Sequence, residues 1–130
     1  MSQGASGKEA EADDYQSGLA LYKAGKLDEA LVCLERLLRS RPDDCHALKL
    51  AGAIHMQRGE HLQAVRCLRK IVVLNPDSAA DVYNLGVAQQ AAGDIGSARH
   101  CYESALAVDP TYTYARDALN ALPASNLPPE

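Results

Sequence analysis

The chain has 130 residues, 47% of them hydrophobic, and its 13 basic and 17 acidic side chains give a formal net charge of −4. A chain of this length usually forms one domain, and its acidic balance argues against nucleic acid or an anionic membrane surface as a partner. Leu and Ala supply most of the apolar content while Phe and Trp are absent, which favours helices over strands.

The beginning of the chain is small and polar, so we expect residues 1–10 to form a disordered tail. It lacks the basic and then apolar order of a signal peptide, and no later stretch is long and apolar enough to span a membrane. We therefore expect a cytoplasmic protein. The four cysteines show no CxxC spacing, which fits reduced thiols and predicts neither a metal site nor a cofactor.

From residue 11 the chain repeats itself with a period of 34 residues. The period is kept by one proline column, two glycine columns, one alanine column and one cysteine column: Pro42, Pro76, Pro110; Gly18, Gly52, Gly86; Gly25, Gly59, Gly93; Ala30, Ala64, Ala98; Cys33, Cys67, Cys101. A fixed period of this size is the signature of a repeat architecture. We expect three repeats, over residues 11–44, 45–78 and 79–112.

Each repeat is expected to form two helices. In the second repeat, apolar residues recur at helical spacing over residues 45–57 and again over residues 62–74. Gly25, Gly59 and Gly93 each follow a first helix, where a residue in the left-handed conformation commonly ends a helix.

The proline column is expected to stop each second helix, because Pro cannot continue one. The residues after each proline carry side-chain oxygens that can cap the next helix. For the second repeat the candidate is Asp43 or Asp44, and for the third it is Asp77 or Ser78.

The remaining glycines, Gly18, Gly52 and Gly86, fall inside the first helices, where Gly costs about 1 kcal/mol relative to Ala. We expect that close approach of another helix explains them, and that the alanine column has the same role on the second helices. A large side chain at any of these positions should then overpack the core by about 1–3 kcal/mol.

After the third repeat, residues 113–122 are expected to form a capping helix that covers the apolar end of the repeat array. Its inward-facing residues are predicted to be Ala115, Ala118, Leu119 and Leu122. Residues 123–130 are expected to form a Pro-rich tail or a linker to further sequence.

These columns resemble the tetratricopeptide repeat family over residues 11–112. In the first repeat, Gly18, Ala30, Leu34 and Pro42 match the family's characteristic small, small, large and proline positions. The resemblance implies an all-α, right-handed superhelical solenoid of antiparallel helix pairs.

In this family the first helices line a concave groove that holds a segment of another protein, and the resemblance implies the same here. The matching positions are mostly apolar with a few polar anchors: Tyr15, Leu19, Tyr22, Lys49, Leu50, Ala53, Met56, Tyr83, Asn84, Val87 and Gln90. Tyrosines at such positions give a large contact area and a hydroxyl for hydrogen bonding. The alternative for Tyr15, Leu19 and Leu50 is that they pack against neighbouring helices.

One subclass of the family uses this groove as a carboxylate clamp for chaperone C-termini. The clamp positions, which need Lys, Arg and Asn, are occupied here by Tyr15, Leu19, Leu50, Ala80 and Asn84. We therefore expect no binding of such acidic tails.

Residues for catalysis are not recognisable, because no Ser/His/Asp set, phosphate-binding loop or pair of carboxylates occurs at a known spacing. We expect no enzyme activity. His46, His55, His61 and His100 lack the i, i+4 spacing of a helical metal site. Cys45, at a predicted helix start, is the one thiol for which reactivity is weighed against simple packing.

The leading expectation is a scaffold or adaptor that binds a peptide or helical segment of another protein. One alternative is self-assembly, because residues 45–78 carry five basic and two acidic side chains while the segments on either side are acidic. Another is a non-catalytic interaction domain of a larger enzyme. A candidate basic patch on the convex side is either a second binding surface or an ordinary solvated face: Arg58, Arg66, Arg69 and Lys70.

Overall fold

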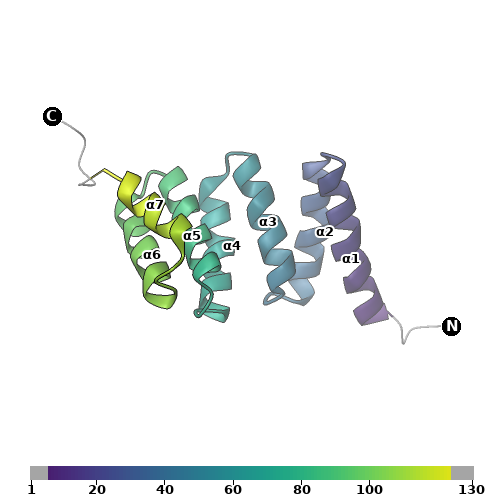
Figure 1. Cartoon of the computed structure of the whole chain (residues 1–130). Coiled ribbons are helices and arrows are strands. Elements are labelled where there is room, and N and C mark those ends of the chain that lie inside the picture. The colour runs from purple at the N-terminus through teal and green to yellow at the C-terminus, as the bar shows by residue number, and fades with distance from the viewer. Residues whose placement is uncertain (1–5, 124–130) are drawn as a thin grey trace.

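The computed structural model describes residues 6–123, with side chains from residue 14 onwards. In this range the chain forms seven α-helices and no strand. They are α1 (Ser6–Lys23), α2 (Leu27–Ser40), α3 (Cys45–Gln57), α4 (His61–Leu74), α5 (Ala79–Ala91), α6 (Ile95–Val108) and α7 (Thr113–Ala121). The helices follow one another in an elongated array with α1 and α7 at opposite ends (Figure 1). The predicted all-α solenoid of helix pairs is confirmed.

The N-terminal boundary differs from the prediction. Helix α1 begins at Ser6, so residues 6–10, expected to belong to a disordered tail, are helical. The physical reason is local, because Lys8, Glu9 and Ala10 are strong helix formers that extend the helix in the N-terminal direction. The rest of the expected tail, residues 1–5, lies outside the described residues, as does the C-terminal tail after Pro123.

The turns within the repeats are set by glycines in the left-handed conformation. Gly25, Gly59 and Gly93 have φ values of 81°, 75° and 89°, and each follows a first helix as predicted. A side chain would be strained at these angles, so Gly is the residue that lets the chain reverse direction here.

The helix caps resolve the alternatives left by the sequence. The Asp44 carboxylate accepts the backbone N–H of Ala47 at 3.0 Å, and the Ser78 hydroxyl accepts that of Asp81 at 3.2 Å. In each pair of candidates, the residue next to the helix is the cap.

Helix packing explains the small residues inside the helices. The alanines of the conserved column, Ala30, Ala64 and Ala98, have no exposed surface. An added Cβ on Gly18 would lie 3.2 Å from Leu34, but the corresponding approach to Gly52 is an ordinary 3.4 Å. The expected close approach of the neighbouring helix is therefore tighter at Gly18 than at Gly52.

The buried residues form two clusters, one in each half of the array. The first lies mainly among α1, α2 and α3, and the second extends from α4 to α7. Ala115 of α7 and Leu122, the C-terminal cap of this helix, are buried, and Ala118 and Leu119 are half-buried against the second cluster, as the capping helix requires. Among the described residues, no helix combines the length and apolar character needed to cross a membrane.

Candidate peptide-binding groove

Five of the predicted groove residues line one pocket between α3 and α5. The pocket has a volume of about 290 Å³. Its lining includes Lys49, Ala53, Met56, Asn84 and Val87. The structure thus brings together residues that are more than thirty positions apart in the sequence, because equivalent helices of successive repeats lie side by side.

A second pocket, of about 520 Å³, lies between α5 and α7. It is lined by the predicted residues Tyr83, Val87 and Gln90, and by Ala118 and Ala121 of α7. Val87 lines both pockets, so they are adjacent along α5. The capping helix therefore contributes to this pocket. Sequence reasoning missed this, because it assigned Ala118 to the core alone and gave Ala121 no role.

The N-terminal residues of the predicted groove line neither of these two pockets. Tyr15, Leu19 and Tyr22 are half-buried and pack against the first core cluster. The Tyr22 hydroxyl accepts a hydrogen bond from Nε2 of Gln57 at 2.7 Å. Leu50 is only 9% exposed and belongs to the core, which favours the packing alternative at this position.

The cation in the first pocket has an intramolecular partner. Nζ of Lys49 lies 3.6 Å from Oδ1 of Asp81, whose side chain is almost fully buried. Asp81 also accepts a hydrogen bond from Nδ2 of Asn75 at 3.1 Å. Sequence reasoning missed Asp81, although its place three residues after the cap Ser78, in the first turn of α5, is favourable for an acidic residue.

Tyr83 and Tyr102, which line the second pocket, belong to a cluster of tyrosines. The Tyr83 ring centroid lies 5.7 Å from that of Tyr102, 5.6 Å from Tyr112 and 6.1 Å from Tyr114. The Tyr102 hydroxyl donates a hydrogen bond to Oε1 of Gln90 at 2.7 Å. Burial raises the pKa of Tyr102 to about 12, and the neighbouring Tyr83 adds to the shift. The side chain is thus a neutral donor at physiological pH.

The four residues of the candidate basic patch do not act alike. Arg58 is the C-terminal cap of α3. It forms ion pairs with Asp28, in the first turn of α2, and with Glu60, in the turn after α3. Nζ of Lys70 lies 3.5 Å from Oδ1 of Asp43. Arg66 and Arg69 are exposed on α4, and neither forms a salt bridge within the part of the chain that the structure describes.

The predicted histidines and cysteines are dispersed. Nδ1 of His55 donates a hydrogen bond to Oε1 of Glu60 at 2.8 Å, and this bond holds the pKa of the Glu60 carboxyl below its usual value. All four cysteines are free thiols. Over residues 6–123 no three His, Cys, Asp or Glu side chains come together as metal ligands.

The pattern of paired helices, left-handed glycines and apolar pockets between first helices defines a class of helical interaction modules. Two tetratricopeptide repeat family models match residues 15–80 and 51–123. The chain therefore belongs to the tetratricopeptide repeat family.

Two relatives to which this chain is similar are much longer than the chain itself. It is 30% identical over 102 residues to mouse "Superkiller complex protein 3" and 34% identical over 113 residues to human "Protein O-mannosyl-transferase TMTC3". These matches cover 78% and 82% of this chain, but only 6% and 12% of the relatives.

Among solved structures, the fold matches the first tetratricopeptide domain of Spaghetti (RPAP3), bound to an HSP90 peptide. The TM-score is 0.75 at 20% identity, and the match covers 86% of this chain and 89% of that one. At this identity the likeness shows a common fold.

Proposed function

We propose that this chain is an interaction scaffold that binds a peptide or helical segment of a partner protein in the groove formed by its first helices and α7. The observation that carries the proposal is the pair of adjacent pockets that share Val87. A partner can insert two apolar side chains, one on each side of this residue. This arrangement fits an amphipathic helix or an extended peptide with apolar anchors.

The polar groups of the groove set the orientation of such a segment. Asn84 and Lys49 lie at the first pocket, and the exposed ring of Tyr114 lies next to Tyr83, which lines the second. With a small contact area, an affinity near the micromolar range, about −8 kcal/mol, is the natural expectation.

The groove chemistry is unsuited to an acidic C-terminal tail. Lys49 already faces the Asp81 carboxylate, and Leu50, at one of the clamp positions, is a core residue. The Spaghetti domain binds an HSP90 peptide. For this chain we propose that chaperone tails do not bind and that apolar segments do.

The proposal also covers the absence of catalysis and the location of the protein. We propose that this segment is non-catalytic, whether it acts alone or as the interaction domain of a larger enzyme. We also propose a cytoplasmic location.

Self-assembly is the competing function. It predicts a concentration-dependent oligomer that dissociates at high salt, because opposite charges on the middle and the ends of the chain would hold the copies together.

The test compares Val87→Glu with Val32→Glu in affinity capture from lysate, followed by a titration with the captured partner. Both changes replace Val by Glu, but Val87 lines the pockets whereas Val32 is 56% exposed on α2. We expect Val87→Glu to lose the partner and Val32→Glu to keep it, with unchanged helical circular dichroism in both. Equal capture by both variants would contradict the proposal.

A further inference from the structure

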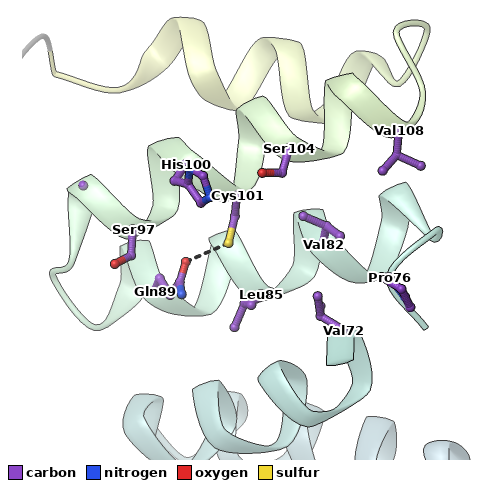
Figure 2. Close-up of a pocket in the computed structure, with 11 residues that line it drawn as sticks. Val72, Pro76, Val82, Leu85, Gln89, Ser97, His100, Cys101, Ser104 and Val108 are labelled. Carbon is purple, nitrogen blue, oxygen red and sulfur yellow. Dashed lines mark hydrogen bonds between the residues drawn. The ribbon is translucent and has the colours of Figure 1, made fainter. Parts of the chain in front are cut away.

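A third pocket lies outside the groove, between α4 and α6. It has a volume of about 520 Å³ and is open to solvent. Val72 and Pro76 lie on the α4 side, Ser104 and Val108 on the α6 side, and α5 forms the floor (Figure 2). We call it the α4–α6 channel.

The channel and the groove use different faces of α5. The channel floor consists of Val82, Leu85 and Gln89, whereas the groove uses Tyr83 and Val87. A ligand in the channel therefore does not compete for the same side chains as a ligand in the groove.

Short side chains on α6 leave the channel open. Gly96, Ser97 and Ser104 line it, and one period earlier the second repeat has Leu62, Gln63 and Lys70 at the corresponding positions. The third repeat thus departs from the second at the places where longer side chains would enter this space.

The channel floor contains a buried polar group with donor capacity to spare. Gln89 is only 6% exposed, and its Oε1 accepts a hydrogen bond from the Cys101 thiol at 3.0 Å (Figure 2). Its Nε2 group has no hydrogen-bond partner among the described residues, yet the side chain lines the channel. The amide nitrogen is not among the fully enclosed polar atoms that lack a partner in the described residues, so it can donate to a group in the channel. An amide donor at the channel surface favours a ligand that brings an acceptor oxygen.

The channel has a cationic edge. Hydrogen bonds from Ser97 hold the pKa of Asp94 below its usual value, and the Arg69 guanidinium lowers it further. Burial raises the pKa of the Cys101 thiol, and Arg69 opposes this rise. Arg69 is exposed on α4 and precedes the channel residue Val72 by three positions, which places the two side chains on the same face of that helix. Its cation therefore lies beside the α4 wall of the channel.

We propose that the α4–α6 channel is a second binding site, which takes a segment of a partner protein with an apolar side chain next to an acidic one. The apolar side chain fills the space between Val72 and Leu85. The carboxylate lies within reach of Arg69 and of the Gln89 amide. The apolar walls of the channel favour the apolar side chain of the segment, and charge complementarity with Arg69 favours its acidic side chain.

The test is an NMR titration of the ¹⁵N-labelled chain with three short capped peptides. Each has a central Leu, flanked by Glu in the first, Gln in the second and Lys in the third. We expect amide shifts at Val72, Leu85 and Ser104, and about tenfold tighter binding of the Glu peptide than of the Lys peptide. Equal affinities, no binding, or shifts confined to Tyr83 and Val87 would overturn the proposal.

Variants separate the apolar and charged contributions. Arg69→Glu should reverse the preference between the Glu and Lys peptides, and Ser104→Leu should weaken all three by filling the channel. Arg39→Glu, the same charge change at an exposed position of α2, and the groove variant Val87→Glu should bind as the unaltered chain does. If Arg39→Glu changed the preference between the Glu and Lys peptides as much as Arg69→Glu does, the preference would depend only on the net charge of the chain. That result would overturn the proposed site.

The same samples distinguish a second copy of the chain as the occupant. Analytical ultracentrifugation of the unaltered chain should show a monomer at concentrations where the Glu peptide binds. A dimer that Arg69→Glu dissociates would assign the channel to self-association and overturn the proposal of a partner segment. Neither result depends on whether the groove binds its own partner.

Discussion

A Cβ atom added to Gly86 would lie 2.7 Å from Cε1 of Tyr102, a contact too short to exist without movement. Tyr102 is 1% exposed and held among the core residues, so its ring has little room to yield. At Gly52 the same atom would meet Leu68 at an ordinary 3.4 Å. Equivalent positions of the repeat thus tolerate a methyl group differently.

We therefore expect Gly86→Ala and Gly52→Ala to change stability in opposite directions. Gly86→Ala should lower the free energy of unfolding by about 1–2 kcal/mol through overpacking. Gly52→Ala should raise it by up to about 1 kcal/mol through helix propensity. Urea unfolding followed by circular dichroism measures both, and equal changes in the two variants would contradict the packing account.

The second prediction concerns Tyr102 at alkaline pH. Because the folded state raises its pKa from 10.0 to about 12, the unfolded chain loses this proton at lower pH than the folded one. The contribution of the neutral Tyr102 side chain to the free energy of unfolding is fully present below pH 10, and it is lost as the pH rises from there towards 12. Tyr102→Phe should remove this part of the pH dependence.

The same variant also tests the hydrogen bond to Gln90. At neutral pH, Tyr102→Phe should cost about 1 kcal/mol, because the Gln90 oxygen loses its donor. Free energies of unfolding at neutral and alkaline pH give both effects. An alkaline slope as steep in Tyr102→Phe as in the unaltered chain would show that other groups cause it.

The third prediction uses two neighbouring aspartates. Asp44→Ala should destabilise the chain by about 1 kcal/mol, because it removes the cap of α3. Asp43→Ala should change stability by less than about 0.5 kcal/mol, since its contact with Lys70 is a surface ion pair. Thermal unfolding of the two variants compares them directly, and a larger effect of Asp43→Ala would reverse the assignment.

The fourth prediction concerns the ion pair in the groove. Lys49→Ala should cost less than about 1 kcal/mol, because half of the Lys49 side chain is exposed to solvent. Asp81→Ala should cost more, because it also removes the acceptor of Asn75 and a favourable charge in the first turn of α5. A double-mutant cycle at low and high salt isolates the pair, whose coupling should shrink with salt.

The sequence by itself determined the repeat register and the course of the backbone. Gly25, Gly59 and Gly93 adopt the left-handed conformation at the predicted turns, and α3 spans the predicted residues 45–57. These features depend on backbone geometry and helix periodicity, which neighbouring residues set. The sequence also predicted the small residues of the core, because each repeat buries its glycine and alanine between neighbouring helices, although the closeness of the approach differs from repeat to repeat.

The tertiary structure alone decided which side chains remain available for binding. Leu50 and Tyr83 both occupy predicted groove positions, but Leu50 lies in the core and Tyr83 lines a pocket beside α7. The pairing of Lys49 with Asp81 also joins residues 32 positions apart. Exposure and charge balance depend on the distances between helices of different repeats, and these distances follow from packing across the whole array rather than from any local pattern.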